Sequence, residues 1–348
     1  MKKRHFAILL CFLMLTLPLA SCTAHPSEPQ VRSSFDWFDT VSTVYSYAED
    51  TPEEFLANYN AVAEVLSEYH RLFDIYYEYS GINNLCTVNR MAGKEPVKVD
   101  VKLIDFIEYA RELYTLTSGE LNIMLGAVLK PWHDCRTEAN DGGEARLPDS
   151  AVLEAAQKHV DINCIVTDRG AGTVYITDPE ARIDVGALGK GYATERAAEA
   201  LLARGVSSYV LNIGGNVRCI GTRPTGSGWT TGITNPDKTS SEPFVCRIEL
   251  KNVSCVTSGN YERFYTVDGK NYHHIIDKDT LYPSEHFALV SVICADSGLA
   301  DGLSTALFCM SYEDGLALTE SLEGVEVLWV RQNGERLTTP EFDNILVK

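Results

Sequence analysis

Three short polar segments carry residue types that could handle a phosphorylated ligand. The first is the run 182–192, which contains Asp184, Lys190 and three glycines. A strand leading through glycines into a helix would expose backbone N–H groups at the helix N-terminus, where anions bind well. The spacing matches neither the Walker A loop nor the Rossmann fingerprint. A glycine-rich turn with a surface lysine remains an alternative interpretation of this run.

The second segment offers a candidate general base. The run 256–263 is followed by 272–277, which contains His273 and His274. Adjacent residues of a strand point to opposite faces, so only one histidine can easily serve a given site. A histidine near a hydroxyl-rich turn can act as a general base, or it can be a hydrogen-bonded structural residue. No C-x-x-C or H-E-x-x-H pattern accompanies the pair, which argues against zinc.

The third segment, 299–306, offers oxygen ligands for a metal. Asp301 and Thr305 are four residues apart, so on a helix they share one face. A carboxylate and a hydroxyl are hard oxygen ligands, which Mg²⁺ accepts together with water and phosphate. The alternative is an N-cap aspartate and a threonine that bonds back to its own helix.

Helices and strands in irregular order must position these segments. The pattern predicts an α+β fold, built as a single large mixed domain. Apolar periodicity predicts helices over 52–73, 101–116, 149–159 (capped by Asp149 or Ser150), 191–203, 299–310 and 312–322. Strands are expected at 182–185, 208–213, 246–250, 274–276, 288–293 and 325–330, with a hairpin turn at 267–270 and a surface loop or insertion at 132–147.

Charge and cysteine content limit the class of partner. The 348 residues include 48 acidic and 30 basic side chains, a net charge of −18, so no nucleic-acid partner is expected. An anionic ligand would need a metal or backbone N–H groups. Apart from Cys11 and Cys22, eight cysteines remain, without a regular framework, and we expect free, mostly buried thiols.

The N-terminus carries a targeting signal. Lys2, Lys3 and Arg4 precede an apolar stretch from Phe6 to Leu17 that is too short for a comfortable membrane span.

The residues that follow, 19–22, resemble the lipobox of a bacterial lipoprotein. They predict a signal peptide over 1–21, a lipidated Cys22 in a flexible tether over 22–35, and one domain over 36–348. The protein would then be extracytoplasmic and lipid-anchored to the bacterial cell membrane. An ordinary secretory signal is the alternative.

Taken in order, the polar segments resemble the ApbE family of FAD:protein FMN transferases. The resemblance runs from about Phe38 to Gly334. Its strongest parts are 184–193, 211–216, 257–263, 273–277 and 300–305, and 73–89 resembles the N-terminal flavin-side loop of the family.

This resemblance implies a reaction and a metal. Family members split FAD, attach FMN through a phosphoester to a threonine of a partner protein and release AMP, and they require Mg²⁺. Carried over by motif, Asp301, Thr305 and the backbone carbonyl of Ala187 would bind the metal. His274 would be the base that takes the proton of the acceptor threonine.

The resemblance also implies the FAD contacts and the acceptor. The FAD contacts would be Phe38, Tyr79, Glu120, Leu121, Asn122, Asp184, Lys190, Thr257, Ser258, Gly259 and Ile275. Other members carry methionine near Phe38 and aspartate at Asn122. The acceptor would be an extracytoplasmic flavoprotein or a membrane electron-transport subunit. Two alternatives stay open: a pyrophosphatase that converts FAD to FMN and AMP, and an FAD-binding lipoprotein without turnover.

Overall fold

An eight-stranded antiparallel sheet forms the centre of the computed structural model, which describes residues 28–347. The strands follow the order β1-β2-β6-β7-β10-β13-β14-β15, and every neighbouring pair is antiparallel. Their bounds are β1 Gln30–Trp37, β2 Thr40–Ser46, β6 Tyr209–Ile213, β7 Asn216–Ile220, β10 Ser254–Gly259, β13 Leu289–Cys294, β14 Glu326–Val330 and β15 Arg336–Thr338. Because the sheet contains no parallel pair, it fits the α+β class better than a βαβ series.

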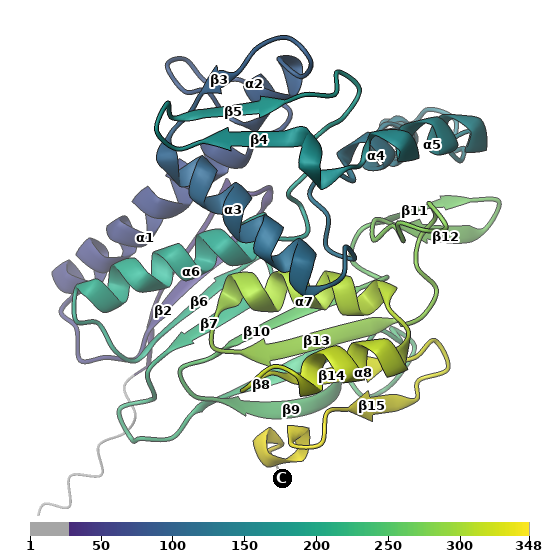
Figure 1. Cartoon of the computed structure of the whole chain (residues 1–348). Coiled ribbons are helices and arrows are strands. Elements are labelled where there is room, and N and C mark those ends of the chain that lie inside the picture. The colour runs from purple at the N-terminus through teal and green to yellow at the C-terminus, as the bar shows by residue number, and fades with distance from the viewer. Residues whose placement is uncertain (1–27, 348) are drawn as a thin grey trace, which may run out of the picture.

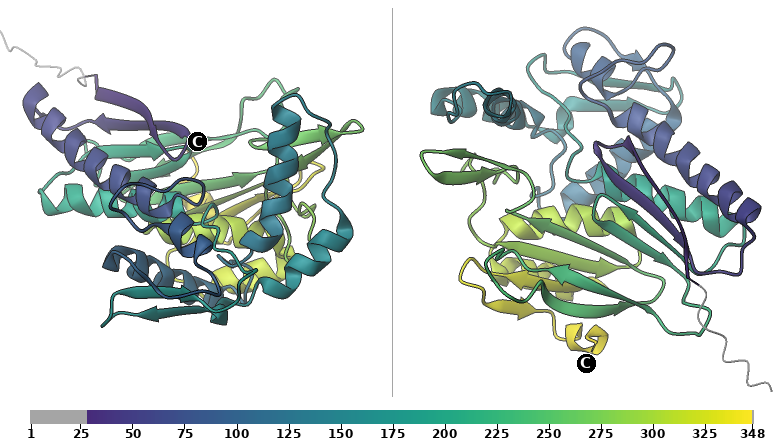
Figure 2. Two further views of the ribbon diagram at one scale, coloured as in Figure 1. Left: turned by 90° about the horizontal axis from the view of Figure 1, so that it is seen from above. Right: turned by 180° about the vertical axis from the view of Figure 1, so that it is seen from behind.

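Helices cover one face of this sheet and a hairpin covers the other. The helices are α1 Pro52–Phe73, α6 Gly189–Ala203, α7 Ser297–Cys309 and α8 Tyr312–Glu320 (Figure 1). The hairpin consists of β8 Trp229–Thr234 and β9 Phe244–Leu250, which lie behind the sheet (Figure 2). Central strand β13 is buried on both faces: Val290 and Val292 belong to the core under α7, and Leu289 belongs to the core under the hairpin. The strand is therefore almost entirely apolar, without alternation.

A second, smaller layer packs against α1 and α6. It contains β3 Val97–Lys98, β4 Ile165–Asp168, β5 Thr173–Ile176, α2 Leu85–Arg90 and α3 Val101–Leu116. Phe106 of α3 packs on Phe73 of α1 and on Tyr192 of α6, with ring centroids 4.2 and 5.1 Å apart. One apolar core thus joins both layers, and the prediction of a single mixed domain is confirmed.

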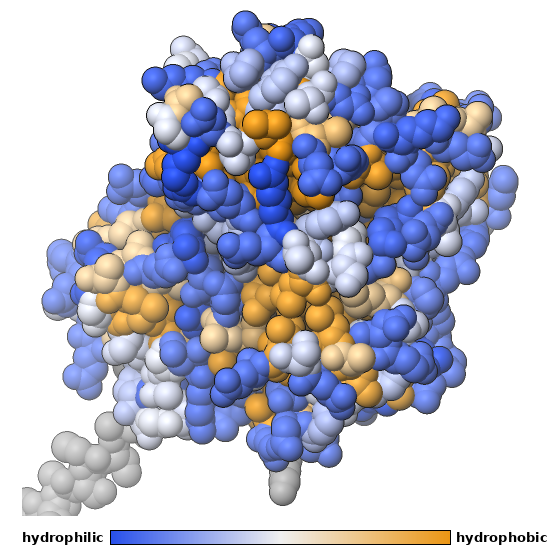
Figure 3. All heavy atoms as spheres, viewed as in Figure 1, coloured by the Kyte–Doolittle hydropathy of each residue, from blue (hydrophilic) through white to orange (hydrophobic). Residues whose placement is uncertain are grey.

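The remaining elements gather at one side of the molecule, at the right in Figure 1. They are α4 Gly126–Asn140, α5 Ser150–Ala156, β11 Phe264–Val267 and β12 Lys270–His273, and short 3₁₀ turns occur at Gln157–His159, Ile162–Cys164 and Phe342–Ile345. The surface of the viewed face is largely hydrophilic, with apolar side chains gathered in the region of α7 and α8 (Figure 3).

The loop prediction for 132–147 is wrong over its first part, because α4 continues to Asn140. Trp132 is buried, and its indole Nε1–H donates to the Leu281 carbonyl at 3.0 Å. The ring stacks on Tyr272, with centroids 6.1 Å apart. A charged, glycine-containing local pattern cannot show that an aromatic cluster distant in sequence holds the segment as a helix.

The predicted helices are confirmed within one or two residues at most ends. Helix α1 begins at a capping box in which Thr51 and Glu54 satisfy each other's backbone N–H groups. The helix expected over 149–159 is capped by Asp149 and ends at Ala156, where a 3₁₀ turn continues it.

Two strand predictions are wrong. Segments 182–185 and 274–276 form only isolated bridges, Leu125 with Arg182 and Ile276 with Pro283. In the first segment the Ile183 N–H donates to the side chain of Asn89 at 2.8 Å, so a side chain replaces a neighbouring strand. The other predicted strands and the hairpin turn at 267–270 are confirmed.

The N-terminal predictions fall mainly outside the described residues. The expected signal peptide and Cys22 lie there. The flexible tether expected over 22–35 is wrong at its end, because β1 begins at Gln30 and pairs with β2. Within residues 28–347, no helix is long and apolar enough to cross a membrane.

The eight cysteines of the domain are free, as expected. Five are buried: Cys135, Cys219, Cys255, Cys294 and Cys309. Cys86, Cys164 and Cys246 are half-buried. Burial raises the pKa of Cys255 to about 12, which keeps this thiol protonated at neutral pH.

Candidate active site

A cavity of about 900 Å³ collects every residue that the sequence predicted for the site. Its lining includes Phe38, Tyr79, Glu120, Leu121, Asn122, Asp184, Ala187, Lys190, Thr257, Ser258, Gly259, His274, Ile275, Asp301 and Thr305. These residues come from segments far apart in the chain, and the volume suits a cofactor-sized ligand.

The glycine-rich run forms one wall of the cavity and begins α6. The side chain of Asn89 fixes the start of this run, because it accepts from the Ile183 N–H and donates to the Ile183 carbonyl. Helix α6 starts at Gly189 without a side-chain cap at Leu188. The Gly189 N–H instead donates to the Val185 carbonyl at 2.7 Å, and the Gly191 N–H donates to Asp301. A Cβ on Gly191 would lie 2.3 Å from both the Asp301 Cβ and the Ser297 carbonyl oxygen. Glycine is therefore required where α6 crosses α7.

Asp301 of α7 is a buried carboxylate at this crossing. Its Oδ2 accepts from the Gly191 N–H at 2.7 Å, and its Oδ1 lies 3.9 Å from the Lys190 Nζ. Burial raises the pKa of Asp301, and the charge of Lys190 opposes that shift. The hydrogen bonds of residues 28–347 include none to Oδ1, so one carboxylate oxygen has free acceptor capacity.

The other predicted metal ligands suit a hard cation. Thr305 lies one helical turn after Asp301, and its hydroxyl is 3.5 Å from that of Ser258. Ala187 lines the same cavity. No group of three His, Cys, Asp or Glu side chains in the described part of the chain could hold a metal alone. One carboxylate, one hydroxyl and a carbonyl form a set that suits Mg²⁺, which retains water and phosphate ligands.

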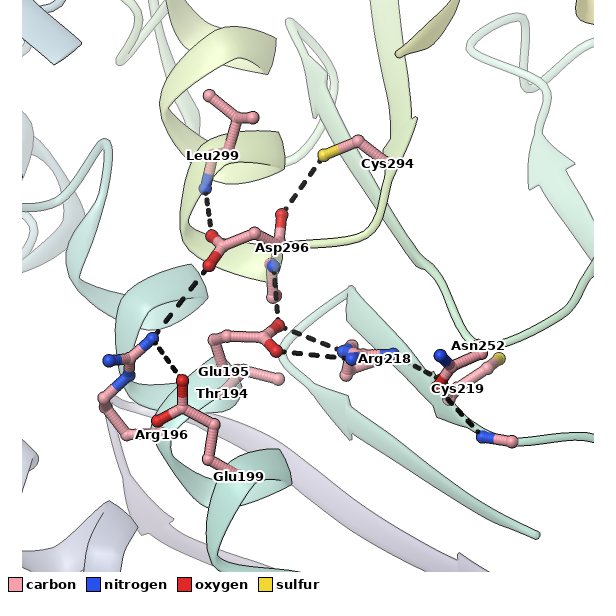
Figure 4. Close-up of polar contacts among 12 residues, drawn as sticks. Thr194, Glu195, Arg196, Glu199, Arg218, Cys219, Asn252, Cys294, Asp296 and Leu299 are labelled. Atoms are coloured by element: carbon pink, nitrogen blue, oxygen red, sulfur yellow. Dashed lines mark hydrogen bonds and ion pairs between the residues drawn. The ribbon is translucent and has the colours of Figure 1, made fainter. Parts of the chain in front are cut away.

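A buried ion pair between α6 and β7 also binds the first residue of α7 (Figure 4). Glu195 of α6 is 6% exposed, and its Oε2 accepts from the Arg218 Nε at 3.0 Å and from the Ser297 N–H at 2.8 Å. Arg218, on β7, also donates to the Cys219 carbonyl. Because Ser297 is the first residue of α7, this network determines how α7 sits on α6 and therefore where Asp301 lies.

His274 lies just beyond β12, and the neighbouring His273 has a structural role. His273 is buried, with Nε2 2.9 Å from the Ser284 carbonyl and Nδ1 accepting from the Ile275 N–H. His274 Nδ1 lies 3.2 Å from the Arg263 carbonyl, which can only accept. The proton is therefore on Nδ1, and the Nε2 lone pair is available as a base. Burial, followed by the charges of Arg263 and Arg136, lowers the pKa of His274 to about 3.

Aromatic residues form the predicted flavin side of the cavity. Phe38 occupies the turn between β1 and β2 with a positive φ of 54°, and its ring meets His70 edge-on at 5.6 Å. The Tyr79 hydroxyl donates to Asp74 Oδ2 at 2.8 Å. His70, which the sequence analysis missed, thus lies between Phe38 and Tyr79.

The segment 120–122 reaches the cavity with its polar groups already engaged. Glu120 pairs with Lys278 at 3.1 Å, and Leu121 is buried. The Asn122 side chain donates to the Val160 carbonyl and accepts from the Met124 N–H. The side chain of Asn122 is thus committed to the local backbone.

The lining residues that were not predicted include His133 and Arg136 on α4, Asn216 on β7, and Arg263 before β11. The Nδ2 atom of Asn216 is buried and has no hydrogen-bond partner within 3.5 Å among the residues described, but the Asn216 side chain lies near enough to Asp301 to lower the pKa of that carboxyl. His133 and Arg136 lie in the segment expected to be a loop, so nothing in the local pattern pointed to them. Asn216 and Arg263 are the last residues of the segments 211–216 and 257–263, which resemble the family. Only their polar or charged side chains could have suggested a role in the site.

Sequence comparisons identify a family that matches most of the chain. The ApbE family profile matches residues 38–329. An FAD:protein FMN transferase of Treponema pallidum is 31% identical over 261 residues, covering 71% of this chain and 70% of the relative. An FAD:protein FMN transferase of Klebsiella pneumoniae is 28% identical over 271 residues, covering 76% and 82%.

Solved structures show the same fold. The ApbE protein of Thermotoga maritima superposes with a TM-score of 0.80 at 26% identity, covering 92% of this chain and all of that one. The flavin transferase ApbE of Vibrio cholerae superposes with a TM-score of 0.75 at 23% identity, covering 91% of this chain and all of that one.

Proposed function

The chain belongs to the ApbE family of FAD:protein FMN transferases, and we propose that it transfers FMN from FAD to a threonine hydroxyl of an acceptor protein in a Mg²⁺-dependent reaction. The observation that carries the proposal is the convergence of all the motif residues on one cavity, around the buried carboxylate of Asp301. The acceptor oxygen attacks the phosphorus on the FMN side of the diphosphate. The bond between the two phosphates breaks, and AMP leaves.

Asp301, Thr305 and the Ala187 carbonyl would hold the metal. When bound, Mg²⁺ neutralises charge that develops on the diphosphate oxygens. The chain's own contribution is to keep Asp301 in place: the Gly191 N–H fixes one carboxylate oxygen and leaves the other available. Lys190, 3.9 Å away, adds a positive charge beside the anionic substrate.

His274 would accept the proton of the acceptor threonine. Its Nδ1–H donates to the Arg263 carbonyl, which leaves the Nε2 lone pair free to accept the proton. Because the pKa of His274 is lowered to about 3 in the ligand-free protein, the imidazole is neutral at physiological pH and able to take a proton. The phosphates of bound FAD would raise that pKa as the proton arrives.

The flavin would lie on the aromatic side of the cavity. Phe38 and Tyr79 offer ring surface there, and the backbone of the segment 120–122 offers polar groups, since the side chain of Asn122 is already engaged. The remaining predicted contacts, from Thr257 to Gly259 and at Ile275, would border the path between flavin and metal.

Location and partner follow from the N-terminal sequence. We propose that Cys22 is lipidated after removal of residues 1–21 and that the domain acts outside the cytoplasm, anchored to the cell membrane. The lipobox-like residues 19–22 support this proposal. The acceptor would then be an extracytoplasmic or membrane-bound flavoprotein. Radiolabelled palmitate incorporated into the full chain, and lost in Cys22→Ala, would test the anchor.

The activity can be tested directly. The purified full-length chain is incubated in detergent with FAD, Mg²⁺ and a candidate acceptor, and the acceptor is analysed by mass spectrometry for FMN on threonine. Asp301→Asn should reduce transfer by about 100-fold or more, since metal stabilisation of developing charge provides several kcal/mol. His274→Asn should bind FAD normally but transfer poorly. AMP and free FMN without a modified acceptor would instead indicate a pyrophosphatase, and unchanged FAD would indicate a binding protein.

A further inference from the structure

Two arginines enter the cavity from elements that an aromatic cluster holds together. Trp132 of α4 stacks on Tyr272 of the β11–β12 hairpin, and its indole N–H donates to the Leu281 carbonyl in the loop that follows this hairpin. Arg136 lies one turn after Trp132 on the same helix, and Arg263 directly precedes β11. Both line the cavity. The packing of α4 on the β11–β12 hairpin therefore brings half-buried Arg136 and exposed Arg263 to one cavity.

Neither guanidinium has a protein partner. The ion pairs found within 4.0 Å in the described structure include neither Arg136 nor Arg263, and the hydrogen bonds include none that either guanidinium donates. The chain as a whole has a net charge of −18, so carboxylates are abundant. Arg136 is half-buried. Its pKa is lowered by burial and by the positive charge of Arg263, with Tyr76 and Asp184 acting in the opposite direction.

Such an arrangement is unfavourable without a ligand. Like charges that share a cavity repel each other, and a half-buried guanidinium loses hydration without gaining hydrogen bonds. Arg218 and Arg169 are paired, with Glu195 and Asp105. Other arginines, such as Arg182 and Arg336, have no ion pair within the described residues either, but only Arg136 and Arg263 line the cavity. Unpaired cations in an acidic protein indicate a place for an anion.

The two arginines lie beside the predicted reaction centre. The Arg263 carbonyl accepts from the His274 N–H at 3.1 Å, which continues the β11–β12 register by one residue. Lys190, from the N-terminal turn of α6, lines the same cavity. Arg136 of α4, Lys190 of α6 and Arg263 before β11 thus line the same cavity as the imidazole proposed as the base, and their charges lower its pKa.

We propose that Arg136 and Arg263 bind the phosphate oxygens of the FAD diphosphate and hold the AMP half as it leaves. This inference rests on the proposed function, because it takes FAD as the ligand. A guanidinium presents two parallel N–H donors that match two phosphate oxygens, whereas a lysine acts as a point charge. A small anion that enters the cavity can reach the half-buried Arg136. For this reason the diphosphate fits better than an acidic side chain of the acceptor.

Binding measurements test the proposal without turnover. The full-length chain is titrated with FAD, ADP and riboflavin in EDTA and in Mg²⁺, for the wild type and for Arg136→Met, Arg263→Met and Arg136→Lys. The control is Arg146→Met, since Arg146 is an exposed residue paired with Glu138 at 3.0 Å. Each methionine variant should bind FAD and ADP about 10-fold to 100-fold more weakly, as expected for loss of a charged hydrogen bond to phosphate.

Other readouts separate this role from a structural one. Riboflavin affinity should stay unchanged, the melting temperature of the ligand-free protein should not fall, and Arg136→Lys should restore part of the ADP affinity. Unchanged affinities for FAD and ADP overturn the proposal. Equal loss of riboflavin binding and of melting temperature would also overturn it. Because only ligand binding is measured, failure of FMN transfer in the wild type is a separate result.

Discussion

Arg218 and the pair formed by Arg136 and Arg263 show two opposite uses of the same side chain. Arg218 is buried, and Glu195 and the Cys219 carbonyl satisfy its guanidinium (Figure 4). Arg136 and Arg263 face a cavity, and within residues 28–347 neither guanidinium has a hydrogen-bond partner. The first arrangement is complete in the folded chain. The second becomes complete only when an anion enters.

The buried Glu195–Arg218 pair stabilises the fold, whereas the cavity arginines are available to bind a ligand. The Glu195 network joins α6, β7 and the first residue of α7, and so it positions Asp301 without contacting the cavity. The cavity arginines do not hold helices or strands together, since Trp132 already packs α4 on the β11–β12 hairpin. Removing a charge should therefore destabilise the fold in the first region and weaken ligand binding in the second. The predictions below are ordered by their expected effect on the free energy of unfolding.

The largest effect is expected from breaking the buried pair. Glu195→Ala leaves Arg218 buried without its counter-charge and should lower the free energy of unfolding by about 3–5 kcal/mol, measured by urea denaturation. The matched control Glu199→Ala removes an exposed partner of Arg196 and should cost less than about 1 kcal/mol. The double change Glu195→Met with Arg218→Met should recover much of the loss, because no buried charge remains. A single-variant loss below that of the control would contradict the structural role of the pair.

The next effect tests the contact between α6 and α7. Gly191→Ala places a Cβ 2.3 Å from Asp301 Cβ, and this overpacking should cost about 1–3 kcal/mol. Helix propensity alone predicts the opposite sign, a gain of about 1 kcal/mol. In Gly170→Ala the new Cβ meets only Asp168 Oδ1 at 3.4 Å, so this variant serves as the control. A gain in stability for Gly191→Ala would show that the helices adjust freely.

A smaller effect should depend on pH. His274 has a folded pKa of about 3, below the value near 6.5 in the unfolded chain. Between these values the unfolded chain binds the proton and the folded chain does not, so the ligand-free protein loses stability as the pH falls through 6.5. The loss from pH 7 to pH 5 should be smaller in His274→Asn and in Arg136→Met. Parallel pH profiles for all three proteins would contradict the repulsion between the cavity cations and His274.

The smallest effect is expected at the cavity arginine. Arg136→Met should leave the free energy of unfolding within about 0.5 kcal/mol of the wild type or raise it, because no protein partner is lost. The same chemical change at Arg218 should destabilise the protein strongly, since it leaves Glu195 unpaired. Equal losses at the two positions would remove the distinction between the two regions.

Local patterns were sufficient for much of the fold and for much of the site. Helices α1 and α3 were predicted at the bounds that the structure has, since amphipathic periodicity and side-chain caps are local properties. The residues around Asp301 and His274 were identified through the resemblance of the ordered motifs to the ApbE family, because spacing alone left each segment with a structural alternative. The predictions failed where a distant contact overrides the local pattern. Examples are Trp132 of α4, held by the hairpin, and Ile183, held by Asn89.

The sequence by itself determined the mixed fold, the membership of the family and the candidate residues for the site. Only the tertiary structure decided that these residues share one cavity, that Asp301 is buried against Gly191, and that Arg136 and Arg263 line that cavity together with His274. The physical reason is that burial and electrostatic interaction depend on distances in space. Helix α4 and the β11–β12 hairpin are more than a hundred residues apart in the chain. Their contact exists only after the aromatic cluster around Trp132 has packed.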